Sequence, residues 1–179
     1  MPALRRDFLA LATLALPSAL LQAQPTHLDA PNVVPITPLL VTSGQPTRAG
    51  LEALSTLGFQ AVIYLAPNNV SSAVKGEAEI VQRQGLEFVH VPIPFGAPDE
   101  SHYLAVAQAL KRLADKKVLI HCEVNMRASS MTFLYRTLAL KEPPATAYEA
   151  VARVWSPRGP WRELIVVQLR KNGVEFDPY

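Results

Sequence analysis

The sequence predicts a single α/β domain in which helices cover both faces of a mainly parallel sheet. Two observations support this. Short apolar runs alternate along the chain with segments whose leucines recur at helical spacing, and 179 residues suffice for one domain of ordinary size. With a single cysteine and 18% charged residues, the composition excludes collagen, coiled coils, disulfide scaffolds and polytopic membrane proteins.

Four buried strands are expected, each a short apolar run that stops at a turn. Runs that are apolar at successive positions are typical of parallel strands covered on both faces. The expected strands are 38–42, 61–66, 86–92 and 117–121.

Six helices are expected between and after these strands. Thr47 can cap the first, which Gly58 ends, and the second covers 75–84. The third should bury a face formed by Leu104, Ala107, Leu110 and Leu113. The last three follow the final strand: one over 128–140, one opened by a capping box of Thr146 with Glu149, and one over 161–171.

The N-terminus has the features of an export signal. Arg5 and Arg6 precede an uncharged apolar stretch that ends at Leu21, a pattern that resembles the twin-arginine signal of bacteria. The stretch is shorter than the roughly 20 residues that span a bilayer, and Ala23 fits a cleavage site. A buried helix and an uncleaved anchor are the alternatives.

These features predict a signal peptide over 1–23 and a periplasmic mature protein that does not insert stably into the membrane. A proline-rich, extended lead-in follows over 24–37, and a single domain occupies 38–179. The net charge of +2, without a basic run, argues against a nucleic-acid partner.

The residues with the clearest chemical potential follow the last predicted strand. Cys122 ends that strand, a short loop follows, and a helix begins near Arg127. The N–H groups of such a loop and the positive end of a helix dipole can hold an anion, and the same field stabilises a thiolate. Arg127 adds a fork that can hold two oxygens of a phosphate. The alternative is a buried cysteine with a structural role only.

The neighbours of Cys122 are expected to complete this site. His121 should fix the loop backbone through a hydrogen bond, and Ser129 or Ser130 could donate to the thiolate. Asn125 can take the left-handed conformation that a tight loop often needs. Glu123 stands at the mouth of the loop, where it could also simply face solvent. The expected substrate-binding residues are Glu123, Val124, Asn125, Met126 and Ser129.

A general acid is expected on the loop before the third helix. Asp99 is the candidate, with Glu100 as a substitute, because this loop follows the strand expected beside that of Cys122. Asp99 is equally well explained as the cap of that helix. The four histidines have no metal-ligand spacing, so no metal site or cofactor is expected.

The stretch from His121 to Ser129 resembles the signature of the cysteine-dependent phosphatase superfamily, which is His-Cys, five residues, Arg, then Ser or Thr. Segments 42–47, 54–58, 61–65 and 85–92 are similar to the bacterial tyrosine-phosphatase-like family related to the β-lactamase-hydrolase-like phosphatase domain. The resemblance covers Pro38 to Leu140. It implies a phosphatase-type αβα sandwich with Cys122 as nucleophile and Arg127 as phosphate binder.

The loop of this chain departs from that signature in two respects. Only four residues separate Cys122 from Arg127, a spacing seen in rhodanese-type sulfurtransferases, and Asn125 replaces the usual glycine. Despite these departures, the export signal and the resemblance together imply an exported, metal-independent phosphatase of the tyrosine or dual-specificity type. It would hydrolyse a phosphorylated protein or small molecule through a thiophosphoryl group on Cys122. The alternatives are sulfur transfer through a Cys122 persulfide and a catalytically idle domain that binds an oxyanion.

Overall fold

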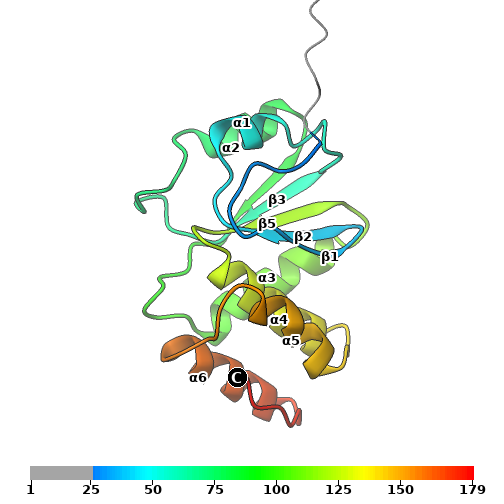
Figure 1. Ribbon diagram of the computed structural model, residues 1–179, viewed down its shortest axis with the longest axis vertical. Coiled ribbons are helices and arrows are strands. Elements are labelled where there is room, and N and C mark those ends of the chain that lie inside the picture. The colour runs from blue at the N-terminus through cyan, green and yellow to red at the C-terminus, as the bar shows by residue number, and fades with distance from the viewer. Residues whose placement is uncertain (1–25) are drawn as a thin grey trace, which may run out of the picture.

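A computed structural model describes residues 26–179, and the predicted signal peptide lies outside this range. The described chain forms one mixed sheet between two layers of helices (Figure 1). The strands, in their order across the sheet, are β1 (Val34–Thr37), β2 (Leu40–Ser43), β5 (Val118–His121), β3 (Ala61–Tyr64) and β4 (Glu87–His90). β1 runs antiparallel to β2, and the other neighbours pair in parallel. The predicted α/β sandwich is confirmed.

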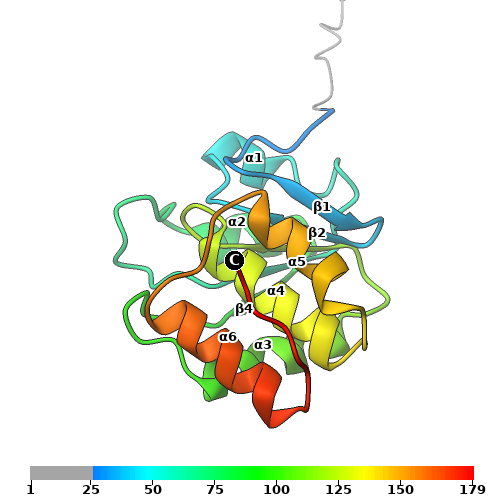
Figure 2. The same ribbon diagram turned by 60° about the horizontal axis from the view of Figure 1, so that its bottom comes forward.

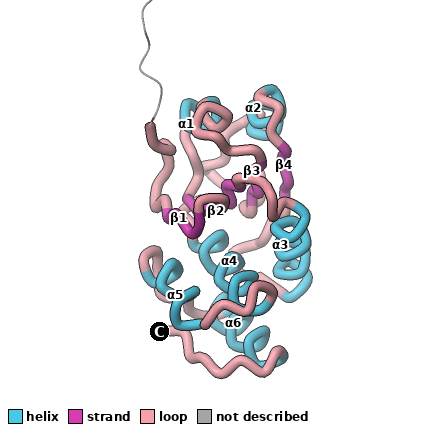
Figure 3. The backbone as a smooth tube through the Cα atoms, turned by 90° about the vertical axis from the view of Figure 1, so that its right-hand side faces the viewer, coloured by secondary structure: helices cyan, strands magenta, loops and turns pink. Residues whose placement is uncertain are grey.

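The two helical layers differ in size. On one face lie α1 (Arg48–Glu52) and α2 (Glu77–Arg83), and Figure 3 shows them apart from the other helices, across the sheet. On the opposite face α4 (Met126–Leu138) is surrounded by three other helices (Figure 2). These are α3 (Glu100–Arg112), α5 (Pro144–Ala152) and α6 (Pro160–Lys171). None of the helices in residues 26–179 is long and apolar enough to cross a membrane.

The central strand β5 divides the core into two parts because its side chains alternate between the faces of the sheet. Leu119 packs in the cluster beneath α1 and α2, whereas Ile120 and Cys122 belong to the cluster around α4. All three side chains have no exposed surface. The nucleophile candidate therefore lies where the larger core meets the carboxyl edge of the sheet.

Two expectations about the sheet need correction. The segment 24–37 contains no helix among its described residues, as expected, but Val34–Thr37 pair with β2 as an edge strand. Pro35 is tolerated there because an edge strand has one side without partners. The second correction concerns the strand that precedes Asp99: β4 is not a neighbour of β5, because β3 lies between them.

Two helices also differ from the prediction. The buried face of α3 is formed by Tyr103, Val106, Ala109 and Leu110, while Leu104 is 57% exposed. Leu110 and Leu113 are buried as predicted. A stripe that begins at Tyr103 buries more apolar surface than one that includes Ala107. α5 begins at Pro144, with no side-chain cap, and Thr146 lies inside the helix, so the predicted capping box is wrong. Proline suits the first helical position because its fixed φ is compatible with the helix and the missing N–H would have no partner there.

Candidate active site

The loop that follows Cys122 has the left-handed turn expected at Asn125, whose φ is 72°. The Asn125 side chain donates to the carbonyl of Asn32 at 2.7 Å and to Oγ1 of Thr42 at 2.9 Å. An asparagine in this conformation can therefore replace the glycine of the usual signature and also tie the loop to its surroundings. The loop is anchored to the lead-in segment and to β2.

Two carbonyls of this loop accept hydrogen bonds from outside it. The carbonyl of Glu123 accepts from the N–H of Gln45 at 2.9 Å, and that of Val124 accepts from the side chain of Asn32 at 3.0 Å. A trans peptide holds its C=O and N–H on opposite sides, so the next two N–H groups point away from these partners. Within residues 26–179, the bridge between Gly44 and Val124 directs the Asn125 N–H toward the carbonyl of Ser43, and the other N–H groups of 123–128 have no backbone carbonyl as partner. Five of these six donors, all except that of Asn125, thus have no carbonyl partner, and they follow the buried Cys122 directly in the chain.

Arg127 is 3% exposed and is held in place by three neighbours. Its Nε donates to the carbonyl of Ile93 at 2.9 Å, its Nη1 donates to Oε2 of Glu123 at 3.0 Å, and its guanidinium lies 5.1 Å from the ring centroid of Phe95. Glu123 therefore does not simply face solvent: its side chain is 30% exposed and pairs with Arg127. Because this carboxylate already occupies one arm of the fork, an incoming anion has to compete with it.

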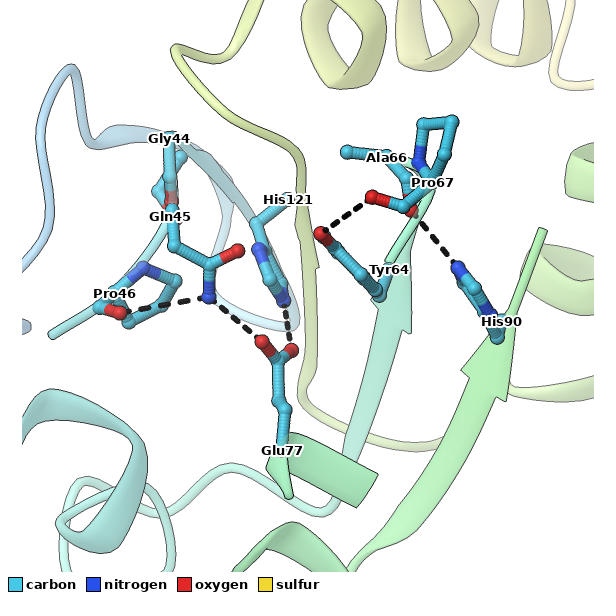
Figure 4. A network of polar contacts seen from close by, with 10 residues as sticks. Gly44, Gln45, Pro46, Tyr64, Ala66, Pro67, Glu77, His90 and His121 are labelled. Atoms are coloured by element: carbon cyan, nitrogen blue, oxygen red, sulfur yellow. Dashed lines mark hydrogen bonds and ion pairs between the residues drawn. The ribbon is translucent and has the colours of Figure 1, made fainter. Parts of the chain in front are cut away.

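His121 does not bind the loop backbone as expected, because its ring faces α2. Its Nε2 lies 2.7 Å from Oε1 of Glu77, and the ring stacks on Tyr64 with centroids 4.8 Å apart (Figure 4). Tyr64 stacks in turn on His90, whose Nε2 contacts the carbonyl of Ala66.

Burial, together with the negative charges of Glu77 and Glu123, raises the pKa of Tyr64 to about 12, so this hydroxyl keeps its proton at neutral pH.

Sequence reasoning missed Glu77. It lies in the first turn of α2 and is 6% exposed, and its carboxylate bridges His121 and the amide of Gln45 (Figure 4). An acidic residue in the first turn of a polar-faced helix usually faces solvent and interacts with the helix dipole. Nothing in the sequence pattern distinguishes Glu77 from the exposed Glu79 of the same turn.

The two serines after Arg127 have different environments. Ser129 donates to the carbonyl of Met126 at 3.2 Å, a bond of the kind that serines make within helices. It is therefore not directed at the thiol. The hydroxyl of Ser130 is fully buried and has no hydrogen-bond partner among the described residues, so its proton is not already committed as that of Ser129 is.

Asp99 caps α3. Its carboxylate accepts from the N–H of His102 at 3.1 Å and from the hydroxyl of Ser101 at 2.6 Å, and His102 completes a capping box. The Ser101 hydrogen bond, followed by that of the His102 backbone, lowers the pKa of Asp99 below its ordinary value. A general acid needs the opposite shift, because it has to hold a proton at the working pH.

The Asp99→Asn variant separates the two roles, because asparagine caps helices about as well as aspartate but holds no acidic proton. We expect its melting temperature and its kcat to stay close to the wild type, whereas Asp99→Ala lowers the melting temperature. Thermal melts and steady-state kinetics on an aryl phosphate measure both. A loss of kcat of about a hundredfold or more in Asp99→Asn would instead establish Asp99 as the acid.

Comparisons by sequence give no match, either to a protein-family model or to a curated protein. Solved structures do match. Two crystal structures of a DUF442 protein from Shewanella putrefaciens CN-32 have TM-scores of 0.73, with 24% and 26% identity, and cover 80% of this chain and 94% and 92% of their own.

Two further structures extend this likeness. Tk-PTP in its active form has a TM-score of 0.62 and 22% identity over 79% of this chain and 95% of its own. PTPMT1 in complex with PI(5)P has a TM-score of 0.64 and 17% identity, with coverage of 79% and 96%. The loop between β5 and α4, with Cys122 at one end and Arg127 at the other, therefore lies in a chain that has the fold of the cysteine-based, protein tyrosine phosphatase-like proteins.

Proposed function

We propose that this protein is a metal-independent phosphatase that hydrolyses phosphomonoesters with Cys122 as nucleophile. The observation that carries the proposal is that five of the six N–H groups of 123–128, all except that of Asn125, have no carbonyl partner among the described residues and directly follow a buried thiol in the chain. N–H groups at the start of a helix that lack a protein partner are satisfied by water or by a ligand. A bound oxyanion would supply acceptors for these donors, and the N-terminus of α4 favours its negative charge.

The proposed reaction has two steps. The Cys122 thiolate attacks phosphorus, so that an S–P bond forms while the P–O bond of the ester breaks and the leaving oxygen takes up a proton. Water then attacks the thiophosphoryl group, which releases inorganic phosphate and returns the thiolate. In both steps the loop N–H groups and the free donors of Arg127 would stabilise the charge on the equatorial oxygens.

The class of substrate is proposed from a structure of similar fold and from the contacts of Asp99. PTPMT1, a protein of similar fold, was solved in complex with PI(5)P. In this protein the Asp99 carboxyl caps α3, and its pKa is lowered by the hydrogen bonds of the cap. A lowered pKa does not favour proton donation to the leaving group. We therefore propose that esters with acidic alcohols, such as aryl phosphates, are hydrolysed faster than alkyl phosphates.

The test is hydrolysis of an aryl phosphate by the full chain in the presence of a chelator, with Cys122→Ser beside it. We expect turnover in the wild type and a loss of at least about a thousandfold in the variant, because a serine hydroxyl is a far weaker nucleophile than a thiolate. Equal melting temperatures would show that the variant is folded. Full activity in Cys122→Ser would overturn the proposal.

A second candidate function is sulfur transfer. It is favoured by the four-residue loop and by the Glu123 carboxylate, which removes one arm of Arg127 from an incoming dianion. Here the thiolate would attack the outer sulfur of thiosulfate, so that a persulfide forms on Cys122 and sulfite leaves. Cyanide would then remove this sulfur as thiocyanate. Thiocyanate formation without phosphatase activity would favour this candidate over the first.

A further inference from the structure

We propose that Glu77 is a positioning residue that holds both flanks of Cys122 and thereby keeps the thiol aligned with the loop N–H groups. This inference deepens the proposed function, since it concerns the same nucleophile. Its test reads the chemical reactivity of the thiol and therefore does not need turnover. Glu77 itself comes from α2, far along the chain from Cys122.

The first flank is the residue before Cys122. Oε1 of Glu77 lies 2.7 Å from Nε2 of His121, the last residue of β5. The His121 ring is fully buried and stacks on Tyr64, and its backbone carbonyl accepts from Leu65. The ring therefore has little freedom to turn, and a shift of Glu77 would be passed on to the backbone that leads into Cys122.

The second flank is the residue after Cys122. Oε2 of Glu77 accepts from the Gln45 side chain at 2.7 Å, and the backbone N–H of Gln45 donates to the carbonyl of Glu123 at 2.9 Å. This bond is one of the two that turn the loop carbonyls away from the free N–H groups. One carboxylate thus acts on both sides of the nucleophile, as Figure 4 shows for His121 and Gln45.

The environment of Glu77 argues that this arrangement is not incidental. Its side chain is 5% exposed, and among the described residues its only ion-pair partner is His121. Burying a carboxylate is costly unless its oxygens are well paired, and helix packing alone would be served as well by an apolar side chain. The exposed Glu79 in the same turn shows that α2 also accepts a glutamate at the surface.

The experiment follows alkylation of the full chain by iodoacetamide at neutral pH, with and without inorganic phosphate. Cys122 is the single cysteine, so the mass shift reports on it alone. In Glu77→Met, which keeps the length of the side chain but not its acceptors, we expect phosphate to protect Cys122 about tenfold less well, and alkylation without phosphate to slow. Glu79→Gln, which removes the same charge from the same turn, should match the wild type.

Glu77→Gln is the conservative variant. Its amide oxygen can accept from His121, and its NH₂ can donate to the oxygen of a flipped Gln45 amide, so we expect it to restore most of the protection. A purely structural role would lower the melting temperature of Glu77→Met without changing the reactivity of Cys122, and that result overturns the proposal.

A Glu77→Met variant that does not fold and a wild type that phosphate does not protect are each decided by a further measurement. If Glu77→Met does not fold, Gln45→Met decides, because it removes the side-chain amide that Glu77 holds and keeps both the Glu77–His121 contact and the backbone N–H that donates to Glu123; unchanged protection and unchanged alkylation would then overturn the proposal. If phosphate fails to protect the wild type, the proposed phosphatase function fails. The alkylation rates of the same variants in the absence of phosphate still test the role of Glu77.

Discussion

Replacing Arg127 with lysine is expected to lower kcat/KM on an aryl phosphate by about 10²–10³, the usual cost of removing one group that stabilises the charge of a transition state. Arg127 uses one N–H to hold the carbonyl of Ile93 and another to hold Glu123, and its remaining donors are free for an anion. The ammonium of lysine is a point charge without this planar fork, so it cannot hold these contacts and a phosphate together. Steady-state kinetics measure the loss.

One variant serves as a control for this prediction, and a second tests the competition for Arg127. Arg112→Lys changes an exposed arginine that pairs with Glu87, the first residue of the edge strand β4, and it should leave kcat/KM unchanged. Glu123→Gln removes the carboxylate that competes for Arg127, so it should strengthen phosphate binding. If Arg127→Lys keeps a third or more of the wild-type kcat/KM, Arg127 does not bind the transferred group.

The Asn125→Ala variant is expected to lower the free energy of unfolding by about 3 kcal/mol. The change removes two hydrogen bonds, to Asn32 and Thr42, at about 1 kcal/mol each, and places an alanine in the left-handed region at a further cost of about 1 kcal/mol. Urea unfolding, followed by far-UV circular dichroism, measures the difference.

Asn125→Gly separates the two contributions. Glycine adopts φ of 72° without strain but lacks the amide, so we expect a loss of about 2 kcal/mol. Since both variants loosen the loop, phosphate should also protect Cys122 less well in each of them. If alanine and glycine destabilise the protein equally, the left-handed conformation contributes nothing measurable to its stability.

The parts of the fold that the sequence predicts well are those whose local pattern and tertiary environment agree. β3 and β5 are uninterrupted apolar runs, and both strands are buried in the centre of the sheet. β1 is expected from the sequence only as extended chain, because Pro35 and the prolines that flank the strand give no strand pattern and its pairing depends on β2. The face of α3 was misjudged because Tyr103 and Leu104 compete for burial, and only the packed sheet decides between them.

The candidate site follows the same division. The positions of Cys122, Asn125 and Arg127 are local properties of a strand, a loop and a helix, and the sequence predicts them. The pairing of Glu123 with Arg127 had a signal in their spacing of four residues, although Glu123 precedes the helix. The contacts of Glu77 join elements from distant parts of the chain, and no pattern in one sequence shows them.

The order of the strands has a consequence for how the protein reaches this structure. β5 is inserted between β2 and β3, yet it is the last strand of the chain. Until it arrives, β2 and β3 each present an open row of hydrogen-bonding groups to other chains. Such long-range parallel pairing is slow, because the intervening chain must first be closed into a loop. The arrival of the segment that contains Cys122 therefore also ends the period in which the growing chain is most prone to aggregate.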